Sequence, residues 1–417
     1  MKTPWYYGWN VIAFCIVFQA ISFGSVFYSF AVLAIPLTKA FTISLSQTML
    51  ATSFLQIGMG ALSPLLGRAL DLMPLRQLVI IGALGLCIGF IILANTSSLW
   101  ILLLVYSCLL PTGLILSGSM AAQTAAARWF IRKRGLALGI SAVGTSVGAF
   151  LFPPLVTALL SRYGLSTTFL AMALLSALII IPLAWLILSR VPNTTDLESQ
   201  VTTPQHPTIC DKSDRNWTMV EILRQPSFWI IISGFAPICA SFTSVQFNLG
   251  AYAHDHGFLS TQTASLLSTL AIAMVGGKFF FAGLSDRIDH RFLFLIMAIS
   301  QGAVLISLQF SPSYTALIAI LILFGFSMGG GLPLLGAMIA DQFGVKAFGR
   351  LIGISTLFIT ASSAAGPYFT ALVYDAVGSF NIAFSAIAAL IIPGALAILL
   401  LKSRSPIIGS IAKSPST

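Results

Sequence analysis

Long uninterrupted apolar runs restrict what this sequence can fold into. Each run is long enough to cross roughly 30 Å of hydrocarbon as a helix, which takes about 20 residues. Only 8% of the residues are charged, against about a quarter in an ordinary globular protein. The sequence therefore predicts an all-α membrane protein with twelve transmembrane helices, and it excludes a soluble globular chain. The runs lie at 9–33, 46–66, 77–95, 99–127, 136–160, 167–189, 228–252, 262–284, 292–310, 314–340, 351–374 and 380–401.

A long polar stretch at 191–226 divides the apolar runs into two groups of six. It contains three prolines before Cys210 and a mixture of acidic and basic side chains, which is the composition of a solvated linker. The end of this stretch, at 217–225, has the pattern of a short interfacial amphipathic helix. The chain is thus expected to consist of an N-terminal half at 1–190, a cytoplasmic linker at 191–226, a C-terminal half at 227–402 and a cytoplasmic tail at 403–417.

The basic residues are divided unevenly between the two sides of the predicted bundle. If the N-terminus is inside, eighteen Lys and Arg fall on the cytoplasmic side and two, Lys39 and Arg162, fall outside. This positive-inside bias predicts a bacterial-type inner (plasma) membrane protein with both termini in the cytoplasm. The net charge of +10 is explained by basic residues that orient the protein in the lipid bilayer, so no nucleic acid is expected as a partner. The remaining basic residue, Lys278, lies inside an apolar run.

Short motifs recur between the two halves at a nearly constant offset. Arg128 corresponds to Asp341 at an offset of 213 residues, and 135–140 corresponds to 349–354 at an offset of 214. A repeated six-helix unit is a transporter architecture. The longest motif is Gly67, Asp71 and Arg76 in the first half and Asp286, Arg287 and Arg291 in the second.

These motifs resemble the loop signature of the major facilitator superfamily, whose fold is twelve helices in two parallel six-helix halves. The resemblance implies secondary active transport by alternating access, and within the superfamily the chain is similar to the monocarboxylate transporter and oxalate/formate antiporter group. That group typically binds the substrate carboxylate with an arginine eight residues before the loop aspartate, where this chain has Lys278. The lysine keeps the charge but lacks the bidentate fork of arginine. The stretches that carry the similarity are Tyr6-Tyr7-Gly8-Trp9, Tyr28-Ser29-Phe30, Ala127-Arg128-Trp129-Phe130 and Gly276-Gly277-Lys278.

The depth of Lys278 points to substrate binding without the family. Asp286 marks the predicted cytoplasmic end of the eighth span, and Lys278 lies eight residues before it. This spacing places Lys278 about 12 Å deep in the membrane. A lysine at mid-membrane costs roughly 2.5–3.5 kcal/mol on insertion scales, and every acidic residue of the chain lies at a span end or in a loop. An anionic substrate about 4 Å away would contribute roughly 4 kcal/mol, so we interpret the substrate as the counter-ion. The alternative is a lysine that snorkels to the interface or bonds helix carbonyls.

Three further polar side chains lie at mid-span and are predicted to bind substrate. They are Tyr28 in the first span and Gln246 and Asn248 in the seventh; the alternative is hydrogen bonding between helices. A single positive charge at mid-span favours a monocarboxylate over a dicarboxylate. If Lys278 binds a proton together with the anion, protons become a candidate coupling ion.

The recurring motif predicts conformational gating. Asp71 is expected near Lys346 and Arg350, and Asp286 near 132–134, where attraction to these cations and to helix N-termini would hold the cytoplasmic side shut. The gating set is Gly67, Asp71, Arg76, Arg128, Asp286, Arg287 and Arg291.

The histidines at 254 and 256 flank Asp255 at the predicted outer end of the seventh span. We expect an exposed loop there, with extracellular pH sensing as the alternative.

No nucleophile, histidine pair or metal constellation lies within a span, and no phosphate-binding loop occurs. We therefore expect no enzyme activity, no cofactor and no metal site, and a protein that functions as a monomer. Two alternatives to anion transport stay open. One is the same fold carrying an amphipathic drug-like compound or a siderophore, and the other is a nontransporting membrane sensor.

Overall fold

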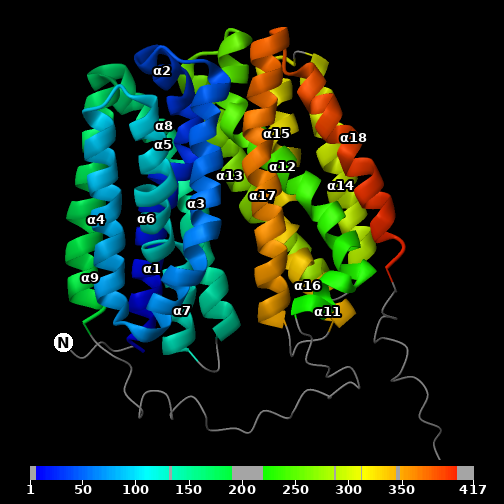
Figure 1. The fold of residues 1–417 in the computed structure, drawn as a ribbon, viewed down its shortest axis with the longest axis horizontal. Helices are drawn as coiled ribbons and strands as arrows, with labels where there is room; N and C mark the ends of the chain where they lie inside the picture. The colour runs from blue at the N-terminus through cyan, green and yellow to red at the C-terminus, as the bar shows by residue number, and fades with distance from the viewer. Residues whose placement is uncertain are drawn as a thin grey trace, which may run out of the picture. The chain divides into compact units, whose positions relative to one another are not determined.

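The computed structural model describes residues 6–130, 134–189, 219–285, 288–310, 312–343 and 348–401. All regular elements in these ranges are helices (Figure 1). Eleven of them are long and apolar enough to cross a membrane, and the longest, Ala137–Ile187, spans 51 residues. It is broken at Gly164, whose φ of 78° is not helical, so it contains two of the predicted spans. The prediction of an all-α membrane protein is confirmed.

The first six spans are formed by helices that three π-helical turns interrupt, at Gly24–Tyr28, Val105–Leu109 and Ser176–Ile180. The helices are α1 (Gly8–Phe23), α2 (Phe30–Phe41), α3 (Leu45–Leu72), α4 (Leu75–Ala94), α5 (Leu99–Leu104), α6 (Leu110–Leu116), α7 (Ser119–Trp129), α8 (Arg134–Leu175) and α9 (Ile181–Ile187).

The remaining spans follow a short helix, α11 (Met219–Arg224), which covers the described part of the predicted interfacial helix. They are α12 (Pro226–Asp255), α13 (Ser260–Ser285), α14 (His290–Ser307), α15 (Tyr314–Gly329) with α16 (Gly331–Phe343), α17 (Phe348–Val377) and α18 (Asn381–Ile398).

The first span is longer than its apolar run predicts. The run ends at residue 33, but the chain continues as α2 to Phe41 and stops at Thr42, whose φ is 54°. Within α2 the hydroxyl of Thr38 donates to the carbonyl of Ile35 at 2.7 Å. A polar side chain thus ends the apolar pattern without ending the helix, because its hydroxyl is satisfied by the helix backbone itself.

Packing divides the described residues into two compact units. Unit 1 comprises the described parts of 1–208, 243–272 and 364–380, and unit 2 comprises the rest. The boundary runs through α12, α13 and α17, and the division into two halves around a linker at 191–226 stays a prediction.

Unit 1 is held together by aromatic packing and by buried polar bonds. In it α1 packs on α8, α4 packs on α8 and α6, and α3 packs on α6. The hydroxyls of Ser22 and Ser117 lie 2.9 Å apart, and Gln19 Nε2 donates to the Ser141 carbonyl at 2.7 Å. These bonds join helices at places where no water is available to satisfy a polar group.

Unit 2 has a similar polar link at its centre. Here α14 packs on α15, α16 and α18. Gln301 of α14 accepts from the hydroxyl of Ser241 at 2.9 Å and donates to the hydroxyl of Ser327 at 3.0 Å. One amide therefore connects α12, α14 and α15.

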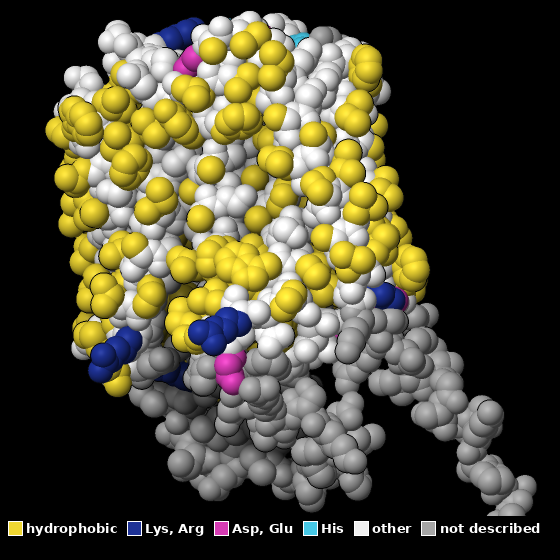
Figure 2. All heavy atoms as spheres, turned by 45° about the vertical axis from the view of Figure 1, so that its right-hand side comes forward, with side chains coloured by type: hydrophobic (Ala, Val, Ile, Leu, Met, Phe, Trp, Pro, Cys, Tyr) yellow, Lys and Arg dark blue, Asp and Glu magenta, His cyan; other side chains and the backbone are white. Residues whose placement is uncertain are grey.

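Large apolar side chains are exposed along the helices, which suits lipid rather than water. Trp100 is 79% exposed, Phe279 69% and Leu178 66%. On the face shown in Figure 2, hydrophobic side chains cover the middle, and the visible Lys, Arg, Asp and Glu side chains lie toward the two ends. This distribution is that of a multi-pass membrane protein.

The crossing of α2 and α12 supplies a test of the packing in unit 1. A Cβ atom on Gly250 would overlap the carbonyl of Ala31, so Gly250→Ala should destabilise the protein by about 1–3 kcal/mol through overpacking. The measurement is the thermal unfolding midpoint in detergent. Gly139→Ala is the control, because a Cβ there meets nothing within 4 Å. Equal midpoints for the two variants would contradict this contact.

Candidate functional site

Tyr28 closes the π-helical turn of the first span. Its ring is 8% exposed and packs with Ala149 of α8 and Ala271 of α13, beside Phe23 and Phe27. Turns of this kind occur frequently at functional sites. The sequence places Tyr28 at mid-span but does not reveal the turn, since one extra residue leaves the apolar pattern unchanged.

A polar stretch of α12 contains buried oxygens that no described residue satisfies. They are Ser244 Oγ, Gln246 Oε1 and Asn248 Oδ1. Asn248 is fixed by its other atom, because Nδ2 donates to the Ser244 carbonyl at 3.0 Å and to the Pro367 carbonyl at 3.2 Å. An unsatisfied buried acceptor costs about 1–3 kcal/mol, so three of them on one helix mark a place that a donor from a ligand or water can occupy. The sequence analysis missed Ser244, whose hydroxyl looks like that of any serine in a membrane helix.

Phe247 brings this stretch against the first span. Its ring centroid lies 4.7 Å from that of Phe27 and 5.8 Å from that of Phe30. Three of the four predicted substrate-binding residues, Tyr28, Gln246 and Asn248, therefore belong to unit 1, on two elements that touch through Phe247.

The fourth predicted residue, Lys278, belongs to unit 2. It lies seven residues before the end of α13, so it is about 10 Å from that end of the helix, and its side chain is half-buried. The backbone of Lys278 packs closely against α15, because a Cβ atom added to Gly329 would lie 2.6 Å from the backbone nitrogen of Lys278. Lys278 thus lies in the last third of α13, and its depth in the membrane stays a prediction.

Two predicted gating residues of the first half make contacts inside unit 1. Arg128 of α7 donates to the carbonyl of Leu70 in α3. Arg76 donates to the hydroxyl of Ser189 at 3.3 Å, and its guanidinium lies 4.5 Å from the ring centroid of Trp185. Both arginines thus tie helix ends together, whatever part they play in gating.

Arg291 does the same in unit 2. It pairs with Asp289 at 2.8 Å and donates to the Leu401 carbonyl at 2.8 Å. Gly67 lies in α3. The side chain of Asp71 and the whole of Asp286 and Arg287 lie outside the described residues, so the gating role of the motif stays a prediction.

A histidine–aspartate pair that the sequence analysis did not identify lies in unit 2. His290 Nδ1, at the start of α14, is 2.5 Å from Asp341 Oδ2 in α16. The two residues are 51 positions apart, and only the packing of α14 on α16 brings them together. Among the described residues, no group of three His, Cys, Asp or Glu side chains is placed to hold a metal ion.

A carboxylate joins α17 to α3 within unit 1. Asp375 Oδ2 accepts from the backbone N–H of Ser46 at 2.8 Å, in the first turn of α3, which Ser44 and Gln47 cap. A negative charge at a helix N-terminus is stabilising. Nearby, the Ser53 hydroxyl donates to the carbonyl of Ala364 at 2.5 Å, so α17 contacts α3 at two levels.

The residues at 254–256 behave differently from one another. His254 and Asp255 are exposed, and Asp255 Oδ1 accepts from the Tyr374 hydroxyl at 3.1 Å. The His256 ring stacks on Tyr252 with centroids 4.2 Å apart. They do not converge on a common point as metal ligands would.

Comparisons with known proteins agree with this architecture. The family profile described as Major Facilitator Superfamily matches residues 12–308 and 241–415. The oxalate:formate antiporter of Oxalobacter formigenes is 25% identical over 331 residues, which are 78% of this chain and 75% of that protein. Monocarboxylate transporter 2 of Rattus norvegicus is 24% identical over 395 residues, 90% of this chain and 79% of that protein.

A solved structure has the same fold. It is the bacterial homologue of the human lysosomal transporter Spinster, in an inward-facing and occupied conformation. The TM-score is 0.72 at 15% identity, over 96% of this chain and 97% of that chain.

The two amides of α12 can be separated experimentally. Gln246→Leu removes an unsatisfied acceptor and should leave the unfolding midpoint unchanged or raise it, whereas Asn248→Leu loses two hydrogen bonds and should lower it, each bond being worth about 0.5–1.5 kcal/mol. Thermal unfolding in detergent measures both. A lower midpoint for Gln246→Leu than for Asn248→Leu would contradict the assignment of the unsatisfied oxygen.

Proposed function

This chain belongs to the Major Facilitator Superfamily, and we propose that it is a secondary transporter that moves a small organic anion, with a monocarboxylate as the favoured substrate. The family and its transporter relatives identify a transporter and not an enzyme. The observation that carries the choice of substrate is a half-buried lysine, Lys278, within a membrane-spanning helix. An ionisable residue inside a membrane span is by default the first candidate for a functional site.

The substrate class follows from the number of charges. Lys278 is the one Lys or Arg of the sequence in the middle of an apolar run, and the span Leu351–Val377 contains none. One positive charge suits one carboxylate. The names of two relatives, an oxalate:formate antiporter and a monocarboxylate transporter, support small carboxylates as a class. Tyr28, Gln246 and Asn248 are the proposed polar partners of the remaining substrate atoms, and a proton carried on Lys278 is the proposed coupling ion.

The orientation is proposed from the charge distribution. Eighteen Lys and Arg on one side against two on the other support an orientation with both termini in the cytoplasm. The end of the bundle with Lys39, Asp255 and Asp375 then faces outside. We propose the inner (plasma) membrane as the location and the monomer as the functional unit.

Alternating access is supported by two contacts, one at that outer end and one deeper along the helices. Asp375 bonds the first turn of α3, and the Ser268 hydroxyl of α13 donates to the Phe150 carbonyl of α8 at 2.8 Å. Helices of the C-terminal half are thereby bonded to helices of the N-terminal half. In the proposed cycle these bonds break when the substrate site opens outward, and the motif aspartates Asp71 and Asp286 form the corresponding contacts inside.

Uptake into proteoliposomes tests the substrate and the role of Lys278 together. The panel is labelled formate, lactate, oxalate and one amphipathic cation, with and without a pH gradient. Wild type should accumulate monocarboxylates in preference to oxalate, and Lys278→Gln should reduce uptake at least ten-fold, as the loss of about 1.4 kcal/mol or more from one charge contact implies. Arg162→Gln, which removes a charge at the predicted outer end, should retain uptake.

Each alternative has its own outcome in that experiment. Preferred transport of oxalate, or intact uptake by Lys278→Gln, would refute the monocarboxylate proposal. Transport of the amphipathic cation alone would favour a drug-type carrier. Binding without flux for every compound would favour a sensor.

The bond of Asp375 to α3 predicts how readily the outer end opens. Asp375→Asn keeps an acceptor but removes the charge, which is worth about 0.3–1 kcal/mol at a helix N-terminus. In a Ser53→Cys background, a membrane-impermeant thiol reagent applied from outside should therefore react roughly two- to five-fold faster. Asp289→Asn is the matched control, because Asp289 accepts from a helix N-terminal amide of α14. Equal acceleration by both variants would show a general loosening and contradict the proposal.

A further inference from the structure

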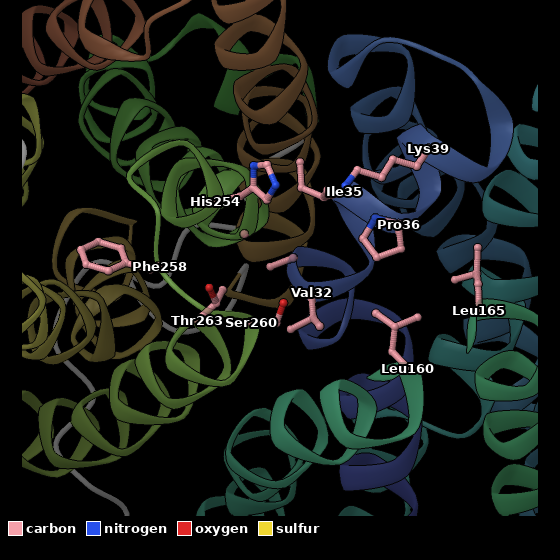
Figure 3. Close-up of a pocket in the computed structure, with 12 residues that line it drawn as sticks. Val32, Ile35, Pro36, Lys39, Leu160, Leu165, His254, Phe258, Ser260 and Thr263 are labelled. Carbon is pink, nitrogen blue, oxygen red and sulfur yellow. The ribbon is translucent and has the colours of Figure 1, made fainter. Parts of the chain in front are cut away.

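A cavity of about 340 Å³ lies within unit 1, at the end of the bundle that we assign to the outside. Helices α2, α8, α12 and α13 contribute to its walls, together with the α12–α13 loop (Figure 3). It is separate from the predicted substrate-binding residues, none of which lines it. Its size falls within the range of small-molecule sites, roughly 300–1,000 Å³. Much of the wall is apolar and is made by Val32, Ile35, Pro36, Leu160, Leu165 and Phe258.

Two basic side chains, Lys39 and His254, line the cavity. In Figure 3 the amino group of Lys39 is turned toward the His254 imidazole, with Ile35 between them. Neither side chain forms an ion pair or a hydrogen bond with any residue that the structure describes. The basic groups are thus available to a ligand.

The acidic residues at this end are engaged elsewhere. Asp375 accepts from Ser46, and Asp255 accepts from Tyr374. Neither carboxylate belongs to the cavity wall. The cavity therefore contains positive charge from Lys39 and no carboxylate from the described residues to compensate it.

The polar part of the wall is the start of α13. Ser260, the first residue of α13, and Thr263, in the same first turn, both line the cavity, and the Thr263 hydroxyl donates to the Leu259 carbonyl at 3.3 Å. The first turn of a helix carries N–H groups without intrahelical partners and a partial positive charge. This turn reinforces the positive field of Lys39 instead of opposing it.

We propose that this cavity is a second anion-binding site, which takes a small amphipathic carboxylate. The carboxylate lies at Lys39 and His254, and the hydrocarbon part lies on the wall formed by Ile35, Pro36 and Leu160. A positively charged concave site raises the local concentration of an anion at the membrane surface, so the cavity collects the anion before transport or receives it afterwards. That this anion is the transported one rests on the proposed function, but the binding itself does not.

Protection of an introduced cysteine tests the site. Ile35→Cys places a thiol between Lys39 and His254, and Leu160→Cys is a second reporter should the first variant fold poorly. The unmodified chain, with its five cysteines, gives the background rate of reaction with a small neutral thiol reagent. Hexanoate should slow the reaction of either reporter at least five-fold, and hexylamine of the same chain length should not.

Charge variants identify the group that binds. Lys39→Gln should raise the hexanoate concentration needed for half-protection at least five-fold, and His254→Gln should raise it as well. Arg162→Gln is the matched control and should have no effect, because Arg162 is an outer cation that does not line the cavity. Equal protection by hexanoate and hexylamine would mean an apolar cavity without anion selectivity and would overturn the proposal.

Lys278→Gln separates this site from the proposed transport site. It should reduce uptake at least ten-fold and leave protection by hexanoate intact. Loss of protection in Lys278→Gln, with retention in Lys39→Gln, would mean that hexanoate acts from mid-membrane and would overturn the proposal. If wild type shows protection but transports no carboxylate, the proposed function fails and the second anion site stands.

Discussion

The hydrocarbon core of a bilayer offers no hydrogen-bond partner to a peptide group, and every element in the described part of this chain meets that constraint. All described elements are helices, whose backbone bonds are satisfied internally. At one place where a π-helical turn disturbs the ladder, a side chain adds a hydrogen bond. The Ser29 hydroxyl, directly after the turn at Gly24–Tyr28, donates to the Gly24 carbonyl at 2.7 Å.

The same constraint separates structural from functional polar groups. Both the oxygen and the nitrogen of the Gln301 amide form hydrogen bonds with neighbouring helices, and the hydroxyls of Ser22 and Ser117 form a hydrogen bond with each other. Gln246 and Ser244 are equally buried, yet each has an oxygen that no described residue satisfies. In a solvent without water such a group is tolerated only where something else fills the gap. This contrast supports a ligand-binding role for Ser244 and Gln246 of α12 and a packing role for Gln301.

Much of the fold could be predicted from the sequence, because a membrane-spanning helix requires a locally apolar composition. The apolar runs predict the spans, since these depend on neighbouring residues alone. Helix ends are less accessible, as Phe41 shows, because a helix can continue beyond its apolar stretch. Pairs such as His290 with Asp341 or Ser46 with Asp375 could not be predicted, because residues far apart in sequence meet only after the helices pack. The π-helical turn at Tyr28 leaves no trace in composition either.

The bond between Asp375 and the first turn of α3 has a consequence for the energetics of a moving part. A charge facing a helix N-terminus at an aqueous boundary is a weak attraction, and dissolved ions screen it. Such a fastening has a low barrier to release and re-forms without any covalent change. Its strength also depends on the ionic strength of the medium at this end of α3, so salt should weaken the bond.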